Sequence, residues 1–135
     1  MDVHYIDSST CKMKYSEMIE AADHLYKALH SLMDVNDQVM EGLIDFVEIV
    51  GALSGAWNEI NTCRIYTQES VDFEELLIPA MGLVNDAKSM IESLVAWKLG
   101  LTPYGRISIL SSVRTAIADG VGPAIALLEN CMTVA

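Results

Sequence analysis

The sequence predicts an all-α protein in which an antiparallel helical hairpin and further helices form one compact domain. Apolar residues recur at the three-and-four spacing of a helix face through most of the chain. A short β-favouring piece around residues 65–67 has no second segment with which a strand could pair. The 135 residues are 52% hydrophobic, which is enough to bury a sizeable core. We therefore expect a single helical domain over residues 15–135, preceded by an N-terminal arm over residues 1–14.

The first predicted helix covers residues 16–33 and follows the arm, which shows no sustained period and is expected to be mobile. Ser16 is the predicted N-cap, and Glu17 and Glu20 suit the positive end of the helix dipole. The apolar face of this helix consists of Met18, Ile19, Ala22, Leu25, Tyr26, Leu29, Leu32 and Met33.

Polar residues at positions 34–37 favour a turn that is followed by a new N-cap. A second helix is predicted over residues 38–64, and the short connection makes the two helices antiparallel neighbours. Gly42, Gly51 and Gly55 lie inside this predicted helix, where each glycine costs about 1 kcal/mol. We expect the close approach of a neighbouring helix to compensate for them.

The helical pattern breaks over residues 66–72, which we expect to form a loop. Residues 73–78 fit one helical turn that Pro79 interrupts or restarts, and the third helix is predicted from Pro79 to Gly100. Gly100 can adopt the left-handed conformation that ends a helix. Thr102 is then a predicted N-cap, and Pro103 fits the first position of the next helix. This corner places Arg106 in the first turn of the new helix.

Two further helices are predicted after the corner. The first of them is shorter than the preceding helices, and Gly120 is expected to end it. Gly122 and Pro123 then mark the start of a final apolar helix over residues 124–131.

Charge is unevenly distributed in a chain whose net charge is −11. No acidic residue lies between Glu92 and Asp119, whereas Lys98, Arg106 and Arg114 fall in that window. The window therefore carries +3 and leaves −14 for the remainder of the chain. We call these three residues the basic island, and they are the candidate DNA-binding residues, because most of the surface would repel nucleic acid.

The cysteine, methionine and tryptophan residues are interpreted as structural. Cys11, Cys63 and Cys131 are odd in number and widely spaced, which favours thiols in a reducing compartment over a disulfide framework or a zinc knuckle. The eight methionines, with Trp57 and Trp97, fall mostly on apolar faces and are expected to pack in the core. A helix–helix oligomer interface is the alternative, because methionine also suits adaptable contact surfaces.

No pattern of catalytic, metal-binding or cofactor-binding residues is evident. His24 and His30 are six residues apart and do not share a helix face, and no Cys-x-x-Cys or phosphate-binding glycine motif occurs. A paired-carboxylate active site would need a basic or histidine partner, so a solvated face is favoured for the acidic ridge. This ridge consists of Asp34, Asp37, Glu41, Asp45 and Glu48. We expect no enzyme activity, no cofactor, no metal and no small-molecule substrate.

The sequence also predicts where the protein resides. The N-terminus begins with acidic residues and lacks an apolar core, so no signal peptide is expected. No uncharged apolar run approaches the roughly 18 residues that a membrane span needs. We expect a cytoplasmic protein without membrane association.

At the corner, the chain resembles the small subunit of a tailed-phage terminase, in the family with a Gly-Leu-Thr-Pro-x-x-Arg signature. The matching residues are Gly100-Leu101-Thr102-Pro103-Tyr104-Gly105-Arg106, followed by Ile109 and Leu110. The resemblance covers roughly residues 25–110. It includes Leu25, Tyr26 and Leu29 in the first helix, Asp37 at the start of the second, and Pro79 at the start of the third.

This resemblance implies a non-enzymatic component of viral DNA packaging, in the host cytoplasm. Such proteins assemble into rings, recognise viral DNA, and recruit or regulate the large subunit that holds the ATPase and nuclease. A ring would also multiply the basic island of Lys98, Arg106 and Arg114 by the number of subunits, and DNA affinity rises with the number of phosphates neutralised.

A second function, from another class, remains open. The −14 outside the basic window and the acidic ridge suit an acidic helical interaction module that binds a basic partner surface. A DNA-mimicking inhibitor would belong to this class. A ring of many subunits favours the first function, and a monomer or dimer favours the second.

Overall fold

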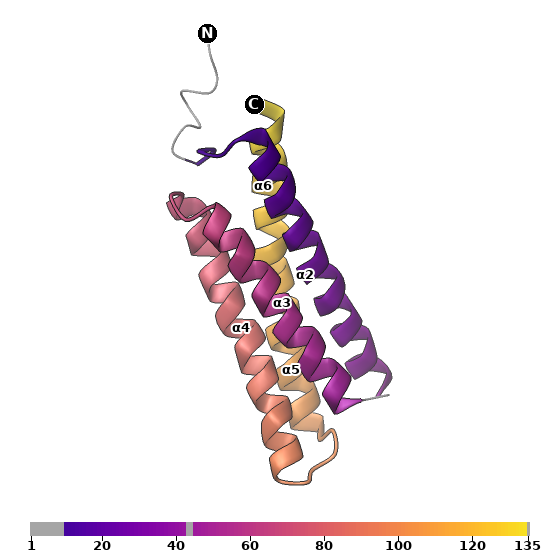
Figure 1. Ribbon diagram of the computed structural model, residues 1–135. Helices are drawn as coiled ribbons and strands as arrows, with labels where there is room; N and C mark the ends of the chain where they lie inside the picture. Colours follow the sequence, from indigo (N-terminus) through magenta and orange to yellow (C-terminus); the bar gives the residue numbers. More distant parts are fainter. Residues whose placement is uncertain (1–9, 43–44, 135) are drawn as a thin grey trace.

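The computed structural model describes residues 10–42 and 45–134, and this part of the chain contains no strand. The predicted all-α class is therefore confirmed. The elements are α2 (Tyr15–Glu41), α3 (Phe46–Tyr66), α4 (Val71–Ala96), α5 (Pro103–Ala116), the π-helix η1 (Ile117–Val121) and α6 (Gly122–Val134). Because α5, η1 and α6 follow one another without a break, they form one long rod beside α2, α3 and α4 (Figure 1).

The four rods run up and down in turn, and each packs against two neighbours (Figure 1). α2 contacts α3, α3 contacts α4, α4 contacts α5 and η1, and the rod of α5 and α6 returns to α2. The predicted hairpin of the first two long helices is thus present as α2 and α3. One continuous apolar core lies between the rods, and its largest fully buried side chains include Phe73, Leu25, Leu32, Leu53 and Leu77.

α2 continues through residues 34–37, so the predicted turn at these positions is wrong. Val35 and Val39 are fully buried and extend the apolar face that includes Leu32. Burying a valine side chain is worth about 1.5–3 kcal/mol, which exceeds the turn preference of the neighbouring polar residues. The helix ends at Gly42, which has a φ of 74° and therefore forms the left-handed C-cap.

The N-terminal ends of α2 and α3 also differ from the prediction. Lys14 is the N-cap of α2, and its backbone N–H donates to the Glu17 carboxylate at 3.3 Å, so Ser16 lies inside the helix. Asp45 caps α3, because its Oδ1 accepts hydrogen bonds from the N–H groups of Val47 and Glu48 at 3.1 Å each. The aspartate that opens the second helix is therefore Asp45 and not Asp37.

The expectation that a neighbouring helix compensates for glycines in the second helix is wrong. Gly42 lies outside the helix, and a Cβ atom added at Gly51 or Gly55 would meet no atom within 4 Å. Both positions face outward from α3, so the monomer gives no packing reason for a glycine there.

Replacing Gly55 with alanine is therefore expected to stabilise the protein by about 0.5–1 kcal/mol, because alanine restricts the unfolded chain and meets no obstacle in the folded one. The same change at Gly51 should add a similar amount. Urea unfolding of the two variants and the unmodified protein measures the effect. A loss of stability at either position would contradict the observation that a Cβ atom there meets no neighbouring atom.

α4 runs unbroken through Pro79, so the prediction that a helix starts at this proline is wrong. The helix begins at Val71 after the loop at residues 67–70, and Phe73 and Leu77 are fully buried before the proline is reached. Pro79 is exposed, as is Glu75, whose carbonyl group loses its usual helical N–H partner. Water can solvate that carbonyl, so the core on the opposite face of α4 holds the helix together.

At the corner, Lys98 rather than Gly100 adopts the left-handed conformation, with a φ of 53°. The N–H of Lys98 donates to the carbonyl of Val95 at 3.0 Å, and that of Leu99 to Leu94 at 2.7 Å. This pair of bonds is a Schellman motif with a non-glycine residue in the left-handed position. The predicted restart is present, because Thr102 accepts a hydrogen bond from the N–H of Gly105 at 2.9 Å and Pro103 is the first helical residue.

The helix after the corner does not end at Gly120. The π-helix η1 instead joins α5 to α6, and Gly120 packs directly against α4. A Cβ atom on Gly120 would lie 2.6 Å from the Ala80 Cβ and 3.0 Å from the Leu76 carbonyl oxygen. Because only a glycine allows this approach, the residue that resembled a helix terminator is a packing residue.

The methionine and tryptophan residues divide between core and surface. Met18 is buried and Trp57 is half-buried, in keeping with the predicted core role. Met33, Met40 and Trp97 are exposed. The part of the chain that the structure describes therefore offers methionine both to the core and to the surface.

Candidate nucleic-acid interface

Two residues of the basic island, Arg106 and Arg114, reach from α5 to the last turns of α2. The guanidinium of Arg106 donates to the backbone carbonyl of Met40 at 2.6 Å. Arg114 donates through Nε to Asn36 Oδ1 at 2.9 Å and places Nη2 3.1 Å from the sulfur of Met40. The structure thus brings these two arginines together on one helix end.

The position of Arg106 explains its local role. The last carbonyl groups of a helix have no partner within the helix, and they carry the negative end of its dipole. Met40 lies in the last turn of α2, so the Arg106 side chain caps that turn and places a positive charge beside it. This cap also fastens the start of α5 to the end of α2.

Lys98 is separate from the two arginines. It is exposed at the corner, and it does not share the partners on α2, Met40 and Asn36, to which Arg106 and Arg114 donate. A monomer therefore presents Lys98 by itself, while the two arginines donate to α2. The basic island therefore consists of two arginines that donate to α2 and one exposed lysine at the corner.

The acidic ridge lies beside the arginines. Asp37 and Glu41 directly follow the two residues of α2 that the arginines contact, Asn36 and Met40. Gln38 donates to both Asp34, at 2.9 Å, and Glu48 on α3, at 3.4 Å, so the ridge spans two helices. Because these carboxylates are within a helical turn of the contacted residues, they offset the positive potential that a DNA phosphate would meet.

An exposed apolar cluster at the corner was not foreseen. The exposed fraction is 77% for Trp97, 75% for Tyr104 and 67% for Ile107. Tyr104 and Ile107 are three residues apart, which is the spacing of one helix face, so their shared position could have been read from the sequence. Their exposure could not, because it depends on which segments pack against the first turns of α5.

No group of three or more His, Cys, Asp or Glu residues in the described ranges is arranged to hold a metal ion. His24 on α2 pairs with Glu59 on α3 at 2.5 Å, and its ring stacks on that of Tyr66. The Tyr66 hydroxyl donates to Glu20, and this hydrogen bond raises the pKa of Tyr66. These contacts join α2 to α3.

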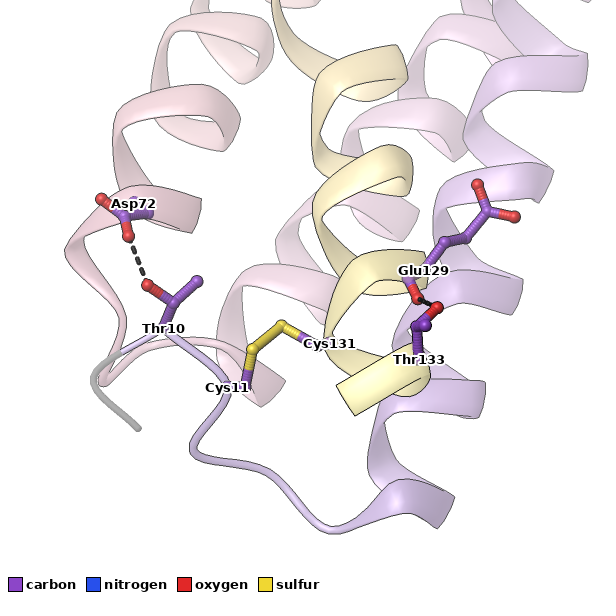
Figure 2. The surroundings of a disulfide bond; sticks show 6 residues. All are labelled: Thr10, Cys11, Asp72, Glu129, Cys131 and Thr133. Carbon is purple, nitrogen blue, oxygen red and sulfur yellow. Dashed lines mark hydrogen bonds between the residues drawn. A yellow bond between two sulfur atoms is a disulfide. The ribbon is translucent and has the colours of Figure 1, made fainter. Parts of the chain in front are cut away.

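The cysteine prediction is wrong for two of the three residues. Cys11 and Cys131 form a disulfide that joins the segment before α2 to α6, and Thr10 donates to Asp72 on α4 (Figure 2). The linked residues are 120 apart in sequence, so no spacing motif could reveal the pairing. Cys63 is a free thiol, and burial raises its pKa to about 12. Of the predicted arm, residues 1–9 lie outside the described residues.

Comparison of the chain with protein-family models, with curated protein sequences and with solved structures gives no match. Among the helices that the structure describes, none combines the length and the apolar character that crossing a membrane requires.

Replacing Arg106 with alanine is expected to destabilise the protein by about 1 kcal/mol, because hydrogen bonds from charged donors are among the stronger ones, while this one lies at the exposed surface. Lys98→Ala is the matched control and should change stability by less than about 0.5 kcal/mol. Urea unfolding measures both variants. Equal effects of the two substitutions would show that Arg106 does not cap α2.

Proposed function

We propose that this protein is a small-subunit-like component of a viral DNA-packaging terminase. In this role it forms a homo-oligomeric ring, recognises viral DNA, and recruits or regulates the large ATPase and nuclease subunit. It works without enzymatic activity of its own, in the host cytoplasm.

The observation that carries the proposal is the position of the signature residues. Thr102 caps α5, Pro103 opens it, and Arg106 fastens it to the end of α2. Three of the five fixed residues of the signature thus have a defined structural role at one corner. A motif that fixes how two helices join suits a family whose members form the same assembly and have no catalytic site in common.

The ring accounts for DNA recognition by a chain of net charge −11. Of the three residues of the basic island, Lys98 is the one whose side chain donates to no group in the described structure, and a monomer gains little from one cation. A ring repeats it in every subunit, and the salt dependence of binding grows with the number of phosphates neutralised.

The assembly and the DNA contact are tested together. Sedimentation velocity and native mass spectrometry should show a closed assembly of several subunits. DNA retention should weaken steeply with salt, and Lys98→Ala should flatten that slope. Arg106→Ala should change it less once the variant is shown to be folded. A monomer that retains no DNA at low salt would contradict the proposal.

The location in the cytoplasm makes a separate prediction for the disulfide. Glutathione and thioredoxin keep cytosolic thiols reduced, so Cys11 and Cys131 should be thiols inside the cell and a disulfide after purification in air. Alkylation of freshly lysed cells, followed by mass spectrometry, distinguishes the two forms. Recovery of a linked pair from rapidly quenched cells would contradict a reducing location.

The acidic interaction module is the second candidate, and the bonding of the arginines favours it. Because Arg106 and Arg114 donate to α2, the acidic ridge dominates this end of the bundle. A monomer or dimer that binds a basic protein, with binding lost at high salt and in Asp37→Asn with Glu41→Gln, would support this function instead.

A further inference from the structure

α2 carries an exposed apolar stripe with a strict period of seven. Its members are Ile19, Tyr26, Met33 and Met40, and their exposed fractions lie between 40% and 49%. Seven residues are close to two helical turns, so the four side chains follow one line along the whole helix. Each stands one residue after a buried member of the core, namely Met18, Leu25, Leu32 and Val39. We call these four residues the α2 stripe.

The α2 stripe lies on the side of α2 that faces α5 and α6. The Tyr26 hydroxyl is 3.4 Å from Glu129 on α6, and Met40 contacts Arg106 and Arg114 on α5. In the order of the bundle, this side is opposite the seam between α3 and α4 (Figure 1). Despite these contacts, each of the four residues keeps 40–49% of its surface exposed in the described structure.

The seam between α3 and α4 is hollowed by two adjoining pockets of about 480 and 370 Å³. They share Trp57 and Asn85, and Ile78 and Met81 supply further apolar lining. We call the pair of pockets the α3/α4 groove. It is lined on α3 from Leu53 to Arg64, a rise of about 16 Å along the helix.

The charges of the α3/α4 groove and the α2 stripe are complementary. The described residues that line the groove include Arg64 and Lys88 but no carboxylate, although Glu74 lies 3.9 Å from Arg64 at one end. The stripe is flanked by the exposed carboxylates of the acidic ridge on α2, namely Asp34, Asp37 and Glu41. In a chain of net charge −11, an acid-free groove is therefore suited to an acidic helix.

We infer that the α3/α4 groove of one subunit receives the α2 stripe of a second copy of this chain. Tyr26 and Met33 are about 10 Å apart along α2, so both fit within a groove of about 16 Å. The carboxylates of Asp34 and Asp37, one and four residues after Met33, then approach the cations of the groove, Arg64 and Lys88. The thioether side chains of Met33 and Met81 allow the two surfaces to adapt to one another.

The contact is heterologous, because the two surfaces differ and lie on opposite sides of the bundle. Each subunit that donates its stripe to one neighbour receives the stripe of another in its groove. Repetition of such a contact gives a ring if the rotation closes and a filament if it does not. This inference rests on the proposed ring and names the surfaces that build it.

Cross-linking between two different single-site variants tests the contact in the full chain. Met33→Cys places a thiol on the stripe, and Gly82→Cys places one at the groove, where a Cβ atom meets nothing within 4 Å. A short bis-maleimide should link a mixture of the two variants and should link neither variant alone. Native Cys63 is buried and Cys11 and Cys131 are paired, so the unmodified protein is the background control. Gln68→Cys, in the exposed turn between α3 and α4, should not link to Gly82→Cys.

A charge substitution gives an independent measurement. Met33→Glu should convert the assembly to monomers, whereas Val95→Glu should leave it intact, because Val95 has the same exposure on the far end of α4. Helical circular dichroism of both variants reports that they are folded.

The remaining outcomes distinguish a failure of this contact from a failure of the proposed ring. An assembly that forms without the Met33–Gly82 link overturns this contact and leaves the ring standing. A link between two Met33→Cys chains overturns it in favour of a symmetric dimer. A monomer at tens of micromolar overturns both the contact and the ring.

Discussion

Replacing Gly120 with alanine is expected to destabilise the protein by about 2–3 kcal/mol, and valine should cost more. The added Cβ would lie 2.6 Å from the Ala80 Cβ and 3.0 Å from the Leu76 carbonyl oxygen, both on α4. Neither neighbour is the flexible end of a long side chain, so α4 and η1 must move apart. This strain exceeds the gain of about 1 kcal/mol that alanine normally brings to a helix.

Urea unfolding and thermal melts measure this effect, with Gly55→Ala as the matched control. The two substitutions are chemically identical, but Gly55 faces open space, so the changes in stability should have opposite signs. The double variant Gly120→Ala with Ala80→Gly removes the closest contact and should recover part of the loss. Stabilisation by Gly120→Ala alone would show that η1 does not approach α4 closely.

Reducing the Cys11–Cys131 disulfide is expected to lower the free energy of unfolding by about 3–5 kcal/mol. The bond closes a loop of 120 residues, and the loss of chain entropy in the unfolded state grows with loop length. Unfolding in urea with and without a thiol reductant measures the difference, and Cys131→Ser should reproduce the reduced protein.

Cys63→Ala is the control for a general effect of removing a thiol. Cys63 is buried and burial raises its pKa to about 12, so the reductant has no bond to break there and the thiol stays protonated at neutral pH. The reductant should therefore shift the unfolding of Cys63→Ala as much as that of the unmodified protein. Identical curves with and without the reductant in both proteins would contradict the disulfide.

The fold class and most helices follow from apolar periodicity, because one amphipathic face can be buried only against another such face. The restart at Thr102 and Pro103 was likewise predictable, since a cap depends on a hydrogen bond between residues three apart. The residues that end the helices were predicted less well. Lys98 took the left-handed position expected of Gly100, because the geometry of the chain reversal decides which residue stands there.

The candidate site was predicted as a set of residues but not as an arrangement. Lys98, Arg106 and Arg114 share one acid-free window of the sequence, yet the two arginines bind the end of α2 and Lys98 does not join them. Their partners, Asn36 and Met40, are more than 60 residues away along the chain. The pattern of charges in the sequence locates the cationic residues but does not indicate which helix end they bind.

By itself, the sequence determined that this chain is a bundle of amphipathic helices with one capped corner, because those features depend on neighbours within a few residues. Only the tertiary structure decided whether a residue with a turn or helix-ending preference adopts the conformation that it favours locally. The turn preference at residues 34–37 yielded to the burial of Val35 and Val39, and the glycine at position 120 became a contact with Ala80. Local preferences are worth about 1 kcal/mol each, whereas burying a large apolar side chain is worth about 2 kcal/mol or more, so packing prevails where the two conflict.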